Sequence, residues 1–317
     1  MTAAAPTKSG GRIRRVGERQ EALAGYLFIL VPMLLFLVLQ VGTTLFAGWI
    51  SLWDWNYRRG AEEFLGIAHY TEILGDDIFL IALKNSVYYT AIWVPLTMAV
   101  GLFLAVVVNQ KIRGRTFFRA AFYFPAVASS AAITVLWIFL LQPDGLFNEV
   151  RGALGLNPLF QALGYGPNHN WFGDFRTALN SVIVLNAWTT SGTFMLFYLA
   201  SLQSISNDVY EAAAIDGAGP WQAFWGVTFP LLKPAHFFVA TVGIIGGLQL
   251  FDQALIAGGV NGDPNNALMS IVLYLYNAAF VQFNPGYAAA IGIVLFLVTF
   301  VITLIQRRVF GDTGGAS

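Results

Sequence analysis

Residues 204–234 read SISNDVYEAAAIDGAGPWQAFWGVTFPLLKP and separate two long apolar stretches of the chain. Asp208 is followed three residues later by Glu211, a spacing similar to a capping box. Both acids would lie near the positive end of a helix dipole, which favours negative charge. The spacing therefore predicts that a short helix begins at Asp208.

The same stretch also contains signals that end one helix and begin another. Gly217 and Gly219 suit the left-handed conformation that terminates a helix, and Pro220 suits the first position of the next. Pro230 is expected to stop that second helix. The pattern predicts a helix-turn-helix, on the cytoplasmic side for the reason of charge given below.

The surface of this hairpin combines small residues with aromatic ones. The first helix has almost no side-chain bulk at Ala212, Ala213, Ala214, Gly217 and Ala218, yet keeps the charges of Glu211 and Asp216. Small residues allow another backbone to approach closely, and Trp221, Phe224 and Trp225 offer apolar anchors. The hairpin is interpreted as a segment that inserts into a cleft of a partner protein. The alternative is a helical loop that lies on its own membrane domain.

Composition makes the bilayer the expected solvent of the rest of the chain. Of 317 residues, 57% are hydrophobic and 11% charged, with a mean hydropathy of +0.64, whereas soluble domains carry about 25% charged residues. The net charge of zero gives no electrostatic reason to expect nucleic acid as a partner. The absence of cysteine excludes disulfides and thiolate metal sites.

Windows without charge predict the membrane spans, because a bilayer core of about 30 Å needs about 20 apolar residues. The prediction is an all-α membrane protein with six transmembrane helices, at about 24–50, 85–109, 120–141, 178–203, 235–257 and 287–306. With both termini cytoplasmic, most of the basic residues fall inside, as the positive-inside rule requires. A seventh span at 267–283 would place Arg307 and Arg308 outside, so that segment is expected to be an interfacial or re-entrant helix.

The remaining segments have simpler predictions. Residues 1–21 are expected to form a cytoplasmic tail, disordered over residues 1–20, and residues 311–317 a second tail, on either side of a transmembrane domain at 22–310. The first span is too long for a secretory signal, whose apolar part has about 7 to 15 residues. The outer loops 54–83 and 142–176 are long enough to dock an external partner, or to form a solvated cap.

Polar residues within spans are expected to point inward, because they are costly to leave facing lipid. Asn186, Trp188, Gln249 and Asp252 are the residues predicted to line a path through the interior of the bundle, because they supply hydrogen-bonding groups and an aromatic face there. Each has an alternative: Asp252 at the outer interface, Trp188 between helices or near headgroups, and Asn186 as a contact between helices.

Several motifs resemble those of one family. Glu211-Ala212-Ala213, Asp216-Gly217-Ala218 and Phe229-Pro230 resemble the EAA motif of permeases of ATP-binding-cassette (ABC) importers. The resemblance to the carbohydrate-uptake branch, and within it to the maltose-type and glycerol-phosphate-type permease, continues in the following residues: Trp188, Gly192, Leu199-Ala200-Ser201-Leu202-Gln203, Phe251-Asp252, Gly258-Gly259, Tyr276, Ala279-Phe280 and Gly286-Tyr287-Ala288. Two positions depart from the family pattern, since Ser206 and Val260 stand where proline is frequent.

The resemblance implies a function in the bacterial or archaeal inner membrane. The chain would pair with a second permease, two ATPase subunits and an extracytoplasmic solute-binding protein, and would import a sugar or polyol. The hairpin 204–234 would couple ATP hydrolysis to transport through Glu211, Ala212, Ala213, Asp216, Gly217, Ala218, Trp221 and Phe224. In this family one permease of the pair can hold the solute alone, and monosaccharide, disaccharide, oligosaccharide and glycerol phosphate all remain open as solutes.

No catalytic site is expected in this chain. No lysine stands in a phosphate-binding loop and no serine in G-x-S-x-G, so ATP would be hydrolysed on another chain. No cofactor is expected, and His69, His169 and His236 are too scattered to predict a metal site. The alternatives are a secondary transporter driven by an ion gradient and a membrane scaffold without a path; dependence of transport on ATP would separate them.

Overall fold

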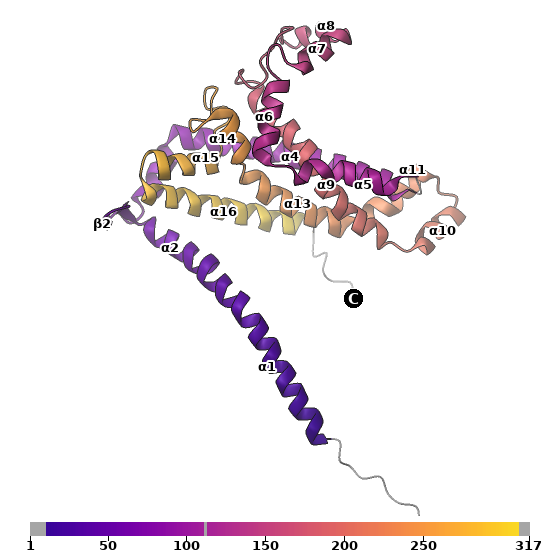
Figure 1. The fold of residues 1–317 in the computed structure, drawn as a ribbon, viewed down its shortest axis with the longest axis horizontal. Coiled ribbons are helices and arrows are strands. Elements are labelled where there is room, and N and C mark those ends of the chain that lie inside the picture. Colours follow the sequence, from indigo (N-terminus) through magenta and orange to yellow (C-terminus); the bar gives the residue numbers. More distant parts are fainter. Residues whose placement is uncertain (1–10, 111–112, 311–317) are drawn as a thin grey trace, which may run out of the picture.

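The computed structural model describes residues 11–110 and 113–310, and these residues are mostly helical (Figure 1). Residues 1–10 and 311–317, which belong to the predicted tails, lie outside this range. The first helix begins at Gly11, so the disorder predicted for residues 1–20 is wrong for residues 11–20. The cause is that Arg, Glu and Gln, which are frequent there, are good helix formers.

The N-terminal helical segment runs away from the rest of the molecule (Figure 1). It consists of α1 (Gly11–Leu35), a π-helical stretch (Phe36–Gly42) and α2 (Thr43–Ile50). All side chains from residue 21 to residue 46 are exposed, although they are largely apolar. A helix that is apolar all round needs a lipid or protein surface to cover it.

A small β-hairpin follows this helix and was not part of the all-α prediction. Strands β1 (Trp53–Asn56) and β2 (Gly60–Phe64) pair antiparallel, with Trp53 opposite Phe64. The Trp-Asp-Trp-Asn alternation has the period of a strand, and Gly60 takes a left-handed φ of 81° at the turn. Helix α3 (Ala68–Gly75) then leads to the bundle.

The core of the bundle forms where four long helices pack. They are α4 (Asp77–Asn109), α9 (Ala178–Gln203), α13 (Lys233–Leu248) and α16 (Pro285–Phe310). Helices α4 and α9 lie along each other, burying Trp93 and Phe194. Gly101 makes this approach possible, because a Cβ there would come within 2.8 Å of Phe194 Cβ.

Two of the helical segments are broken. Helices α5 (Arg115–Val127) and α6 (Ser130–Leu140) meet at an angle of 93°, where a single span at about 120–141 was predicted. Helix α13 ends at Leu248, and the short helix α14 (Asp252–Gly258) begins after it. The described residues thus contain five helices long and apolar enough to cross a membrane, or six if the α5–α6 pair is one span.

The remaining elements lie at the ends of the bundle. At one end is the predicted hairpin, formed by α10 (Asn207–Ile215), α11 (Pro220–Ala223), a π-helical stretch (Phe224–Thr228) and α12 (Phe229–Leu231). Towards the opposite end are α14, α15 (Ile271–Tyr276) and a further π-helical stretch (Asn277–Val281) (Figure 1). Helix α6 carries α7 (Leu146–Ala153) and α8 (Asn157–Ala162) away from the bundle (Figure 1).

Segment 267–283 packs against the bundle through buried side chains, including Ile271 and Leu273. Asn85 Nδ2 donates to the carbonyls of Asn266 and Met269 at 2.9 and 3.0 Å, and Ser86 Oγ accepts from Ile271 N at 3.0 Å. These contacts fix the segment to the start of α4. Its interfacial or re-entrant placement in the membrane stays a prediction.

Candidate functional site

The first helix of the hairpin begins one residue after Ser206, not at Asp208. Ser206 is the N-cap of α10, and its Oγ accepts from Asp208 N at 3.2 Å. Asp208 therefore lies in the first turn, where its charge still favours the helix dipole. Ser206 takes an extended backbone (φ −63°, ψ 142°), a conformation that proline also adopts, so the departure from the family pattern replaces a rigid residue by a side-chain cap.

The turn that ends α10 depends on a single glycine. Gly217 has φ 81°, and Gly217 N and Ala218 N donate to the carbonyls of Ala214 and Ala213 at 3.1 and 2.9 Å. This pattern is a Schellman motif, which satisfies the last carbonyls of the helix. Gly219, by contrast, has φ −70°, so its predicted left-handed conformation is wrong.

The second helix starts at Pro220 as predicted but does not stop at Pro230. Pro230 stands within α12, and helical backbone continues as far as Leu231. The π-helical stretch at 224–228 comes directly before this proline. There Phe229 N donates to the carbonyl of Phe224, five residues back, instead of the carbonyl four residues back as in an α-helix. Tyr210 OH lies 3.2 Å from Thr228 Oγ1 and ties α10 to this stretch.

The hairpin presents the residues that were predicted to meet a partner. Glu211, Ala212, Asp216, Gly217 and Trp221 are exposed, whereas Ala213, Ala218 and Phe224 are half-buried. One apolar residue at the tip was missed by the sequence analysis: Ile215 is 87% exposed, more than Trp221 at 73%. An isoleucine and a tryptophan so exposed at one end of the bundle form an apolar tip.

A chain of aromatic rings leads from this tip into the bundle. Ring centroids are 5.8 Å apart for Trp221 and Trp225, 5.0 Å for Trp225 and Phe229, and 4.5 Å for Phe229 and His236. His236 Nδ1 lies 2.9 Å from the hydroxyl of Tyr198, which is fully buried in α9. The exposed hairpin and the core helices α9 and α13 are thus packed as one unit.

A second site is a cavity of about 310 Å³ between α4, α9 and the break after α13. Its polar lining is contributed by Asn186, Gln249, Asp252, Gln253, Tyr89, Thr189 and Thr190. Three of the four residues predicted to line a path, namely Asn186, Gln249 and Asp252, therefore meet here. Asn186 is held in place by a bond of 2.7 Å from its Nδ2 to Tyr89 OH.

Trp188 is the exception. It is 46% exposed and packs on Trp137, with ring centroids 5.9 Å apart, and it does not line the cavity. Trp188 follows Asn186 by two residues, which places the two side chains on opposite sides of a helix. The alternative of packing between helices fits Trp188 better than the path.

The broken backbone at residues 249–251 places Asp252 at the cavity. Residues 235–257 were predicted as one continuous span, with Asp252 lining the path or, alternatively, at the outer interface. In the structure Gln249 N and Leu250 N donate to the carbonyls of Gly246 and Gly247 at 3.2 and 3.4 Å, and a new helix starts at Asp252. Irregular backbone of this kind is tolerated at membrane depth only where it is buried in protein or lines a hydrated cavity.

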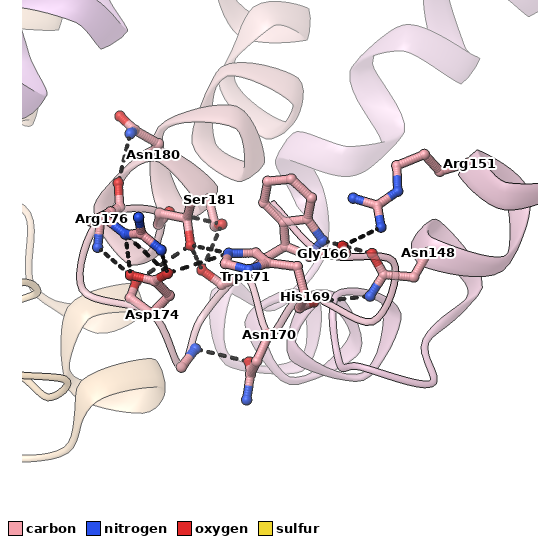
Figure 2. A network of polar contacts seen from close by, with 12 residues as sticks. Asn148, Arg151, Gly166, His169, Asn170, Trp171, Asp174, Arg176, Asn180 and Ser181 are labelled. Carbon is pink, nitrogen blue, oxygen red and sulfur yellow. Dashed lines mark hydrogen bonds and ion pairs between the residues drawn. The ribbon is translucent and has the colours of Figure 1, made fainter. Parts of the chain in front are cut away.

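The segment 141–177, called the cap below, is held together by its own polar contacts (Figure 2). Arg151 is only 2% exposed, lies over the rings of Phe160 and Trp171, and donates to the carbonyls of Gly166 and Pro167. Asn148 Nδ2 donates to three carbonyls, those of Gln142, Pro143 and His169, and Asn148 Oδ1 accepts from Trp171 Nε1 at 3.0 Å. The segment is therefore internally packed, and docking of a partner and a solvated cap both stay predictions for it.

An ion pair closes the other side of the cap (Figure 2). Arg176 Nη2 donates to Asp174 Oδ2 at 2.7 Å, and these bonds lower the pKa of Asp174 to about 2. Burial lowers the pKa of His169, and this effect exceeds that of the Asp174 charge, which raises it. At neutral pH the folded cap is therefore stabilised with Asp174 ionised and His169 uncharged.

Comparisons with known proteins all match this chain to membrane components of transport systems. Residues 97–311 match the family described as "Binding-protein-dependent transport system inner membrane component". The probable ABC transporter permease protein YurN of Bacillus subtilis (strain 168) is 34% identical over 294 residues, with 92% of this chain and 97% of YurN covered. The arabinooligosaccharides transport system permease protein AraP of the same organism is 34% identical, with 84% and 83% covered.

A solved structure has the same fold. A chain of a bacterial ABC transporter involved in the import of the acidic polysaccharide alginate superposes with a TM-score of 0.78 at 20% identity. The match covers 96% of this chain and 100% of the other. The chain therefore has the fold of a chain from an ABC transporter of known structure.

Proposed function

This chain belongs to the family of binding-protein-dependent transport system inner membrane components, and we propose that it is one of two permeases in an ATP-driven importer of a sugar or related polyol. Its ATPase would reside on two partner chains. An extracytoplasmic binding protein would deliver the solute. Support for the sugar comes from relatives such as AraP, whose name specifies arabinooligosaccharides.

The observation that carries the proposal is the exposed hairpin at one end of the bundle. A tip built of Ile215 and Trp221, flanked by the small residues Ala212 and Gly217, offers apolar anchors that another chain can approach closely. Glu211 and Asp216 add charge at its rim, which favours a complementary basic partner. We assign the partner as the ATPase subunit, and Glu211, Ala212, Ala213, Asp216, Gly217, Ala218, Trp221 and Phe224 as the coupling residues.

We propose that the cavity lined by Asn186, Gln249 and Asp252 forms part of the path along which the solute crosses the membrane. Amide and carboxylate groups supply the hydrogen bonds that sugar hydroxyls need, and Tyr89 and Trp93 add aromatic surface. A break in a helix beside the site is typical of transport proteins. Closure of the ATPase pair would pull on the hairpin and, through α13, on this cavity.

Transport by the assembled complex in vesicles tests the proposal. Purified permeases and ATPase subunits are reconstituted, the loaded binding protein is added outside, and radiolabelled solute uptake is measured with and without ATP. Uptake that requires ATP is expected. Uptake that persists without ATP and follows a proton or sodium gradient would contradict the proposal.

Glu211→Lys tests the coupling role separately. Reversing this exposed charge should leave the chain in the membrane but reduce uptake at least about tenfold, since about 1.4 kcal/mol lost at an interface is a factor of ten. Retention of the ATPase subunit on the purified permease should fall as well. Glu63→Lys, at another exposed acid, on β2, is the matched control and should retain the ATPase subunit normally.

A further inference from the structure

Gln253 stands at the boundary between two hollows of the bundle. The larger, of about 310 Å³, is the proposed path cavity, and the smaller, of about 150 Å³, is lined by residues including Pro125, Ser130 and Leu185. Gln253 lines both, together with Thr189 and Thr190. Its side chain therefore helps to divide a space that the surrounding helices leave open.

A hydrogen bond holds the Gln253 side chain in this position. Its Nε2 donates to Ser130 Oγ at 2.8 Å. Ser130 is the first residue of α6, directly after the 93° bend, and Gln253 is the second residue of α14, directly after the break at 249–251. The bond thus joins two helices that both start at an interruption, where the backbone can adjust at lower cost than within a regular helix.

The volumes of the two hollows indicate what the hydrogen bond between Gln253 and Ser130 separates. Sites for small molecules measure roughly 300–1,000 Å³, so the larger hollow lies at the lower end of this range and the smaller falls below it. The larger hollow alone suits a short saccharide. Access to the smaller one as well would accommodate additional sugar units.

We propose that Gln253, positioned by Ser130, limits the length of the saccharide that this permease accepts. The inference rests on the proposed function, because it takes the cavity as part of the path. Loss of the Ser130 bond frees the amide to swing aside, joins the two hollows and admits longer oligomers. Gln253 acts on chain length rather than on the identity of the sugar.

Uptake as a function of chain length tests this inference. Radiolabelled arabinose, glucose and galactose oligomers of one to five units are each saturated on the binding protein, and their uptake into vesicles holding the complete complex is compared. Gln253→Ala and Ser130→Ala should each raise the ratio of the longest to the shortest transported oligomer about fivefold, the effect of one hydrogen bond. The double variant should do no more than Gln253→Ala alone, because that variant already lacks both the amide and its bond to Ser130.

The controls separate this inference from the proposed function. Ser130→Ala removes only a hydroxyl and serves if Gln253→Ala fails to reach the membrane. Gln282→Ala removes a similar side-chain hydrogen bond, which Gln282 Nε2 donates to Asn277 Oδ1 away from both hollows, and should leave the ratio unchanged. Normal uptake with an unaltered length ratio in Ser130→Ala would overturn this inference alone, whereas no uptake of any oligomer by the wild-type complex would overturn the proposed function and this inference together.

Discussion

Ser206 shows how one side chain fixes the geometry of the hairpin. Its hydroxyl satisfies one of the free N–H groups at the start of α10. Loss of such a cap costs about 1 kcal/mol. Since α10 is only nine residues long and has no buried residue, it has little packing to compensate.

Ser206→Ala is therefore expected to increase opening of α10 about fivefold, the equivalent of 1 kcal/mol. Hydrogen exchange of residues 207–212 in the purified permease measures this opening. Ser206→Asp keeps a capping oxygen and should restore protection. Equal exchange in the alanine variant and the wild type would show that the cap does not stabilise the helix.

One face of α9 shows how much of the candidate site could be predicted from the sequence. Asn186, Thr189, Thr190 and Thr193 follow the i, i+3, i+4, i+7 spacing of one helix face, and all four line one or both of the hollows. This signal identifies the face and leaves Trp188 outside it. The partners of that face, from α4 and from the break before α14, are not visible in the sequence, since they depend on tertiary packing.

Among the elements, long apolar helices were easier to predict than their interruptions. The bend between α5 and α6 and the break after Leu248 occur within apolar sequence, so windows without charge do not reveal them. Proline was also misleading at Pro230, which was expected to stop the second helix of the hairpin but lies inside α12. Broken helices are also a feature of secondary transporters, so family membership, not the breaks, decides against that alternative.

The aromatic chain from the hairpin to Tyr198 is the element through which motion would reach the bundle. His236→Leu removes a ring from this chain and leaves the buried Tyr198 hydroxyl without its partner, at a cost of about 1–3 kcal/mol. We expect less solute to be transported for each ATP hydrolysed. His236→Phe retains the ring and should recover part of the ratio.

A purely structural role of His236 would change the amount of protein but not that ratio. Phe300→Leu, at an exposed position of α16, is the control and should not alter it. An unchanged ratio in His236→Leu, with normal protein in the membrane, would show that the aromatic chain does not transmit movement.

The outer cap should respond to pH as a unit. The lowered pKa of His169 means that the unfolded cap binds a proton more readily than the folded one. The stabilisation is therefore complete above the ordinary histidine pKa of 6.5 and decreases as pH falls below it. Asp174 acts in a separate window, because its contribution is lost only between its ordinary pKa of 3.8 and about 2.

Hydrogen exchange of residues 145–177, corrected for the intrinsic effect of pH, should thus increase from pH 7.5 to 5.5. His169→Phe keeps a ring between Tyr165 and Trp171 and removes the titrating group. Its exchange should be nearly independent of pH in this range. The same pH profile in both proteins would assign the response to another group.

The two ends of the bundle should face opposite sides of the membrane, with the hairpin in the cytoplasm and the cap outside. The cap leads directly into the start of α9 and the hairpin follows the end of α9, so the two lie at opposite ends of this helix (Figure 1). Six spans with cytoplasmic termini place Ile215 and the end of α16 inside and the cap outside. Seven spans, with 267–283 crossing the membrane, would instead place the end of α16 outside.

The absence of cysteine allows a direct test of this arrangement. Leu154→Cys, Ile215→Cys and Arg308→Cys each introduce one thiol at an exposed position. A membrane-impermeant maleimide should label Leu154→Cys in intact cells, and the other two only after permeabilisation. Ile215→Cys should in addition be protected when the ATPase subunits are present, because the proposed interface covers this side chain. Labelling of Arg308→Cys in intact cells would exclude the six-span arrangement, and full labelling of Ile215→Cys in the assembled complex would exclude the hairpin as the ATPase contact.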